Sequence, residues 1–120
     1  MSNRIVSIGQ HRFTNVICTD GPGQGGACHE YEVGSVEEGN PVSYGRISFQ
    51  NGPIKEVGVN GCHHEDLLAI VLDRLEYFQK GEYSCRENAL ALNKIQEAMH
   101  WLNHRTTARQ ERGVEGTHKK

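Results

Sequence analysis

The residues with the clearest chemical potential in this sequence are three arginines near its end, Arg105, Arg109 and Arg112. They stand at i, i+4 and i+7, so on a helix they would lie within about 60° of one another. Like charges at this spacing repel, which makes the stack mildly unfavourable unless an anion completes it. Arginine suits phosphate because its planar guanidinium donates two parallel charge-assisted hydrogen bonds. The pattern suggests an anion clamp, and a solvated basic helix end is the alternative.

Histidine and cysteine side chains offer metal-binding or catalytic alternatives. His100 and His104 would share one helical face, but Trp101 replaces the general-base glutamate of an H-E-x-x-H motif. Further candidate ligands are Cys28, His29, Cys62, His63 and His64. No spacing requires these sets to converge, and no acid-base constellation stands out. We therefore expect no metal site, no cofactor and no catalytic residue.

A glycine-rich loop at 20–28 matches the dinucleotide fingerprint in form only. Gly21, Gly23 and Gly26 have the G-x-G-x-x-G spacing after a strand-like run. The fingerprint needs a helix next, to receive the pyrophosphate at its N-terminus, whereas ACHEYEV follows and has a strand pattern. No Lys-Ser/Thr follows the last glycine, so the loop is not a P-loop either. We expect a hairpin loop.

The arginines stand on the second of two predicted helices. The first begins near His63 and ends at Gly81. The second begins with a Ser84–Glu87 capping box and meets no Gly or Pro before Gly113. At ~1.5 Å per residue it would be about 40 Å long. The predicted buried stripes are Leu67, Leu68, Val71, Leu72, Leu75 and Phe78 on the first helix, and Leu92, Ile95, Met99 and Leu102 on the second.

The short connection between these helices requires them to fold back as an antiparallel hairpin. The bend then brings Phe78 and Asn88 together and leaves Arg105 and Arg109 far away on the same chain. A phenylalanine ring that stacks on a base and a side-chain amide that hydrogen-bonds it could together recognise a purine. The alternatives are that the phenylalanine is a core residue and the asparagine is solvated. Within one chain the bend and the arginine end are too far apart to form one site, so a shared site would require an oligomer.

The first half of the chain reads as β structure. Five short runs with β-branched or aromatic alternation are separated by turn residues: 4–8, 15–19, 29–34, 44–50 and 54–59. We predict an α+β fold, with a small N-terminal antiparallel sheet followed by a C-terminal antiparallel hairpin of two helices, the second one long. The 120 residues would form a single domain, with a β-rich part at 1–60, the hairpin at 61–113 and a tail at 114–120.

Charge and hydropathy restrict the partners. Residues 1–104 carry 8 basic and 13 acidic side chains, whereas residues 105–120 carry 5 basic and 2 acidic ones. A small anion bound at one end fits this distribution better than a long nucleic acid, for which a pI above about 9 is usual. No stretch approaches a membrane span and the start lacks a signal-peptide core, so we expect a cytosolic protein with reduced cysteines.

The helical half resembles a family of phage proteins. The segments GVNGCHHEDLLAIVLDRL, SCRENALALNKIQEAMHWLNHRTTAR and RGVEGTHK resemble the first described type of Thoeris anti-defence protein. The hairpin is also similar to that of phage anti-CBASS sponge proteins. The resemblance covers roughly residues 47–120, and little is recognisable in residues 1–45. It implies a non-enzymatic sponge that captures glycocyclic ADP-ribose in the cytoplasm of an infected bacterium, as homodimers that assemble into hexamers.

The resemblance also implies site residues. Phe78 would stack on the adenine, Asn88 would hydrogen-bond the base or a ribose, and Arg105 and Arg109 would clamp the pyrophosphate. A second site for cyclic trinucleotides would use Asn60, Gly61, Arg112, Gly113 and Thr117. Two alternatives stay open: an accessory protein that binds nucleic acid or a host protein through its basic tail, and a metal-dependent nucleotide hydrolase.

Overall fold

A computed structural model describes residues 3–9, 13–36, 39–117 and 119 of the chain. Internal contacts divide the chain into two compact units, Met1–Cys62 and His63–Lys120. The first unit carries the strands and the second carries the two long helices. The prediction of a single domain stays a prediction. The predicted tail at 114–120 lies partly outside the described residues.

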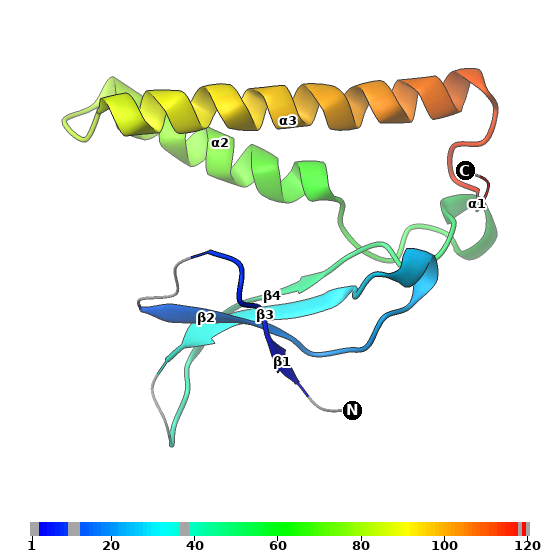
Figure 1. Cartoon of the computed structure of the whole chain (residues 1–120), viewed down its shortest axis with the longest axis horizontal. Coiled ribbons are helices and arrows are strands. Elements are labelled where there is room, and N and C mark those ends of the chain that lie inside the picture. The colour runs from blue at the N-terminus through cyan, green and yellow to red at the C-terminus, as the bar shows by residue number, and fades with distance from the viewer. Residues whose placement is uncertain (1–2, 10–12, 37–38, 118, 120) are drawn as a thin grey trace. The chain divides into compact units, whose positions relative to one another are not determined.

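The first unit is built on a four-stranded antiparallel sheet whose strands follow one another in chain order (Figure 1). The strands are β1 (Arg4–Ile5), β2 (Thr14–Cys18), β3 (Glu30–Ser35) and β4 (Ser43–Ser48). Val16 pairs with Val33 across β2 and β3, which gives the sheet an apolar face. On the opposite face Glu32 accepts a hydrogen bond from Ser43 at 3.0 Å. The antiparallel sheet, followed along the chain by helices, confirms the predicted α+β class.

The predicted fifth strand at 54–59 is wrong. Residues Ile54–Val57 form a short helix, α1, between Pro53 as N-cap and Gly58 as C-cap. The backbone N–H groups of Val57 and Gly58 donate to the carbonyls of Pro53 and Ile54, at 2.9 and 2.8 Å. Gly58 ends the helix at a φ of +77°, which a β-branched residue would adopt only with strain. The Asn51-Gly52-Pro53 turn therefore leads into a helix and does not close a hairpin.

The second unit is a pair of antiparallel helices, α2 (His64–Lys80) and α3 (Arg86–Glu111), which lie side by side (Figure 1). The predicted start and end of the first helix are confirmed. The backbone N–H of His63 donates to the Asp66 carboxylate at 2.9 Å, and Gly81 is the C-cap. The predicted apolar stripes are half-buried except at Val71, where the prediction is wrong because the side chain is 45 % exposed. Neither helix contains a fully buried residue. None of the described helices has the length and apolar character needed to cross a membrane.

The predicted Ser84–Glu87 capping box is wrong, because α3 begins one residue later. Its N-cap is Cys85, whose Sγ accepts the backbone N–H of Asn88 at 3.4 Å. The side chain of Gln79 donates to the Cys85 carbonyl at 3.1 Å and accepts the Cys85 N–H at 3.0 Å. This double hydrogen bond from α2 fixes Cys85, so Glu87 is the second helical residue and no longer the third.

The far end of α3 closes in a Schellman motif. Gly113 has a φ of +73°, and its N–H donates to the carbonyl of Gln110 at 3.0 Å. The N–H of Val114 donates to the carbonyl of Arg109, also at 3.0 Å. This pair of bonds defines the motif and requires a left-handed residue, which glycine supplies. The prediction that no glycine interrupts the helix before Gly113 is confirmed.

Candidate functional site

The hairpin bend brings Phe78 and Asn88 into one neighbourhood through Tyr83, which stands in the connecting loop. The rings of Phe78 and Tyr83 meet edge to face, with centroids 5.9 Å apart. The Asn88 side-chain amide donates to the Tyr83 carbonyl at 3.3 Å. Arg74 lies one turn before Phe78, with its guanidinium carbon 5.0 Å from the ring centroid. The bend thus combines a half-buried phenylalanine ring, an exposed tyrosine ring, an amide and a cation.

Two of these neighbours, Tyr83 and Arg74, were missed by the sequence analysis. Arg74 could have been found because it precedes Phe78 by four residues on the same helix, a spacing that places side chains on one face. Tyr83 stands in a loop, where spacing predicts no direction for a side chain. A second aromatic face at this position would give a base two surfaces to contact.

At the other end of α3 the structure separates the roles of the two arginines. Arg105 is exposed, and no hydrogen bond or ion pair links its guanidinium to another described residue. The side chain of Arg109 is only 12 % exposed, and its Nε lies 3.5 Å from the Glu115 carboxylate. The N–H donors of Arg105 therefore face solvent, whereas those of Arg109 bond within its own chain, and the role of Arg105 in a pyrophosphate clamp stays a prediction.

Arg109 organises the tail that follows α3. Its guanidinium donates to the carbonyls of Val114 at 2.9 Å, Thr117 at 3.1 Å and Lys119 at 2.6 Å. These three hydrogen bonds use three of the five N–H donors of the guanidinium, and the Glu115 carboxylate adds an ion pair. The assignment of Arg109 to a pyrophosphate clamp stays a prediction, and it would require some of these bonds to be exchanged for bonds to the ligand.

The two ends of the hairpin lie far apart within one chain. Asn88 is in the first turn of α3 and Arg105 comes 17 residues later in the same helix. At ~1.5 Å per residue, the two positions are separated by about 25 Å along the helix axis. One small ligand therefore cannot touch both ends of the same hairpin.

The residues of the predicted second site are engaged in local structure. The Asn60 side chain accepts the Asn51 N–H at 2.8 Å and donates to the Asn51 carbonyl at 2.7 Å. A side chain at Gly61 would collide with the backbone of Phe49 and Gln50, so only glycine fits there. Asn60 and Gly61 precede α2 and belong to the first compact unit.

The remaining second-site residues belong to the second unit. The N–H of Gly113 is used in the Schellman motif, and Thr117 bonds the Val114 carbonyl through both its N–H and its hydroxyl. Arg112 is the C-cap residue of α3. These bonds hold the tail as a compact turn, and the use of these residues as a phosphate site stays a prediction.

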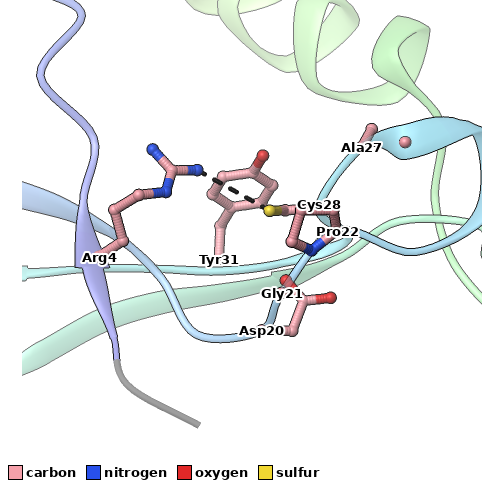
Figure 2. A pocket seen from close by; sticks show the side chains of 8 residues that line it. Arg4, Asp20, Gly21, Pro22, Ala27, Cys28 and Tyr31 are labelled. Atoms are coloured by element: carbon pink, nitrogen blue, oxygen red, sulfur yellow. Dashed lines mark hydrogen bonds between the residues drawn. The ribbon is translucent and has the colours of Figure 1, made fainter.

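A third group of side chains, in the sheet unit, was not brought together by the sequence analysis. Cys18, Asp20 and Cys28 place one ligand-type atom each within 4.8 Å of the others. Asp20 and Cys28 also line a pocket of about 640 Å³, together with Arg4 and Tyr31 (Figure 2). Among the described residues no comparable group includes His100 or His104. The two cysteines stand where a strand ends and the next begins, which was the available signal.

Comparison with known proteins assigns the helical pair to a protein family. Residues 43–107, more than half of the chain, match the family model described as the Acb2/Tad1 hairpin domain. The chain therefore belongs to the Acb2/Tad1 hairpin family, and the family resemblance seen in the sequence is confirmed.

A curated relative comes from Bacillus phage SBSphiJ7 and is named Thoeris anti-defense 1. It is 57 % identical to this chain over 74 residues, which are 62 % of this chain and 52 % of the relative. The chain thus spans about half the length of the curated relative that it matches. The match with the family model covers β4, α1, α2 and most of α3, and leaves β1 to β3 outside.

Proposed function

We propose that this protein is a phage anti-defence sponge that binds glycocyclic ADP-ribose and withholds it from Thoeris immunity without degrading it. The observation that carries the proposal is the match of residues 43–107 to the hairpin family, supported by a phage protein named Thoeris anti-defense 1 that is 57 % identical to this chain over 74 residues. The protein would act where the signal is made, in the cytoplasm of the infected bacterium.

The chemistry at the two hairpin ends is complementary to this ligand. Glycocyclic ADP-ribose contains an adenine, two riboses and a pyrophosphate. Phe78 and Tyr83 offer aromatic surface for the base, and the Asn88 amide offers a donor and an acceptor. Arg105 offers an exposed guanidinium for the pyrophosphate. Binding of this kind requires no nucleophile, general base or cofactor.

The separation of the two ends implies that the site forms between copies of the chain. Because about 25 Å of helix lies between Asn88 and Arg105, the bend of one subunit must face the arginine end of another. The hairpin also leaves large apolar side chains exposed, with Ile70 and Tyr77 at 65 % and Trp101 at 60 %. A second hairpin would cover such surface. We propose a homodimer that assembles into a hexamer.

The test is a calorimetric titration of the purified full chain with glycocyclic ADP-ribose, followed by heating and chromatography of the released material. A sponge binds tightly and returns the ligand intact. A changed product would instead indicate an enzyme, and absence of binding to any cyclic nucleotide would reject the proposal. Salt-dependent DNA binding in the same preparation would then favour the basic-tail alternative.

A second arm tests whether cyclic trinucleotides of CBASS bind separately. We propose that they use the Asn60–Gly61 turn and the tail residues Arg112, Gly113 and Thr117. Glycocyclic ADP-ribose should then bind with unchanged stoichiometry to protein that is already saturated with a cyclic trinucleotide. Mutual displacement would contradict two independent sites.

A further inference from the structure

The sheet unit contains a cluster of three side chains that the hairpin function does not use. Cys18 is the last residue of β2, Asp20 opens the following loop, and Cys28 closes that loop two residues before β3. The two Sγ atoms and a carboxylate oxygen all lie within 4.8 Å of one another. Tetrahedral zinc with bonds of about 2.3 Å to sulfur sets its ligand atoms about 3.8 Å apart. Small side-chain rotations would therefore suffice to surround a metal ion.

The backbone holds two of these groups in place. The side chain of Cys18 is fully buried, and its thiol donates to the Asp20 carbonyl at 3.1 Å. The Asp20 carboxylate accepts the backbone N–H of His29 at 3.1 Å and that of Glu30 at 3.1 Å. Carboxylates fixed in this manner by outer hydrogen bonds are typical of ordered metal ligands.

Cys28 and Asp20 face an accessible space. They line the pocket of about 640 Å³, whose other walls include Arg4, Pro22 and Tyr31 (Figure 2). A metal ion could enter from this side, and a water molecule could occupy a fourth position that the protein does not fill.

The charges balance around a divalent ion. Two thiolates and one carboxylate carry −3, so a divalent cation would leave −1. The Nη2 atom of Arg4 lies 3.8 Å from the Cys28 Sγ (Figure 2). The Arg4 guanidinium thus supplies the compensating positive charge. Two sulfurs favour a soft or borderline ion, because magnesium and calcium prefer oxygen ligands alone.

We propose that Cys18, Asp20 and Cys28 form a zinc-binding site, with a pocket water as the fourth ligand. Binding of one Zn²⁺ converts the two thiols to thiolates, and their two protons pass to solvent. The ion would tie the end of β2 to the start of β3 and close the Asp20–Cys28 loop. The sheet would be stabilised most by this link, because Cys18 is its only fully buried side chain among the described residues.

Cobalt titration of the reduced full chain tests the site, because Co²⁺ substitutes for zinc and reports its ligands in its absorption spectrum. We expect one equivalent of Co²⁺ to produce a thiolate-to-cobalt charge-transfer band and the visible bands of a tetrahedral ion. One equivalent of Zn²⁺ should then remove these bands. Zn²⁺ should also raise the unfolding midpoint by about 5 to 10 °C.

Three variants separate this site from other thiols. Cys28→Ser and Asp20→Asn should weaken cobalt binding at least about 100-fold. Cys85→Ser is the matched control: it removes a thiol at the start of α3 and should leave the spectrum unchanged. Absence of a thiolate band in wild type would overturn the proposal, as would its loss in Cys85→Ser.

A measurement without variants covers the case in which a substitution prevents folding. Zn²⁺ should slow the alkylation of Cys28 in wild-type protein while Cys85 reacts at its original rate. Equal rates with and without zinc would overturn the site. The site would also be rejected if Cys18 and Cys28 form a disulfide and the protein takes up no cobalt after that disulfide is reduced.

Discussion

At the residue scale, Arg105 and Arg109 have the same chemistry but different surroundings. Arg105→Ala should weaken binding of glycocyclic ADP-ribose by about 10- to 150-fold, the equivalent of one charge-assisted bond of ~1.5 to 3 kcal/mol. Its thermal stability should not change, because Arg105 has no bonded partner among the described residues. Titration calorimetry and thermal unfolding of the same variant measure both effects. Unchanged affinity would remove Arg105 from the site.

Arg109→Ala should instead destabilise the fold. The side chain is 12 % exposed and bonds three tail carbonyls, so its loss removes the donors to the Thr117 and Lys119 carbonyls, one of the donors to the Val114 carbonyl and the ion-pair partner of Glu115. We expect a loss of about 2 kcal/mol in the free energy of unfolding. Proteolysis of the tail after Gly113 should become faster in the same variant. Arg109→Lys keeps the charge but loses the planar set of guanidinium N–H donors, so it should recover only part of the stability.

Asp20 makes the sheet unit sensitive to acid. Burial opposes ionisation of this carboxyl, but hydrogen bonds from the backbone N–H groups of Glu30 and His29 and from the Cys18 thiol outweigh it, so its pKa is lowered. A lowered pKa contributes stability above the unfolded-state value of about 3.9 and loses it as pH falls through the folded-state value. Acid unfolding followed by circular dichroism should show this loss below about pH 4. Asp20→Asn should flatten the pH dependence in that range.

At the element scale, the start of α3 tests which residue caps the helix. Cys85 accepts the Asn88 N–H through sulfur, a weak acceptor, at 3.4 Å. Cys85→Ser should therefore stabilise the helix by about 0.5 to 1 kcal/mol, because serine is a preferred N-cap. Ser84→Ala should be neutral within about 0.5 kcal/mol, since Ser84 precedes the cap. Chemical denaturation compares the two, and a clear loss in Ser84→Ala would restore Ser84 as the cap.

The same helix shows what the sequence could predict. Its length, its apolar seam and its end at Gly113 follow from local periodicity and from the absence of glycine, so they were predicted correctly. The position of its cap depends on Gln79 reaching across from α2, a contact between elements that spacing cannot predict. At 54–59 the β-branched residues suggested a strand, and Pro53 and Gly58 determined a helical turn.

Part of the candidate site could likewise be predicted from the sequence, and part of it could not. Phe78 and Asn88 could be placed together because a short loop forces the helices to be antiparallel. The tail carbonyls around Arg109 could not be predicted, because they depend on a turn that Gly113 and Thr117 form after the helix. The Cys18, Asp20 and Cys28 cluster likewise depends on the path of residues 19–29 between β2 and β3, which the glycine spacing did not determine.

At the scale of the whole molecule, a binding site shared between hairpins can be tested by complementation. Phe78→Ala removes the aromatic surface at the bend, and Arg105→Ala removes the guanidinium at the other end of the helix. In a homodimer of either variant, both sites lack one of these two side chains. In a two-fold dimer formed from one copy of each variant, one site carries both substitutions and the other carries neither.

Refolding the two variants together should therefore restore about a quarter of the tight sites, because half of the randomly formed dimers are mixed and each has one intact site. Titration with glycocyclic ADP-ribose counts the sites directly. The two variants mixed without refolding serve as the control, since subunits that do not exchange cannot complement. If the refolded mixture binds no better than either variant, Phe78 and Arg105 do not meet across a two-fold interface. The ligand would then be held at one hairpin end only, and a single substitution at the other end should bind as tightly as wild type.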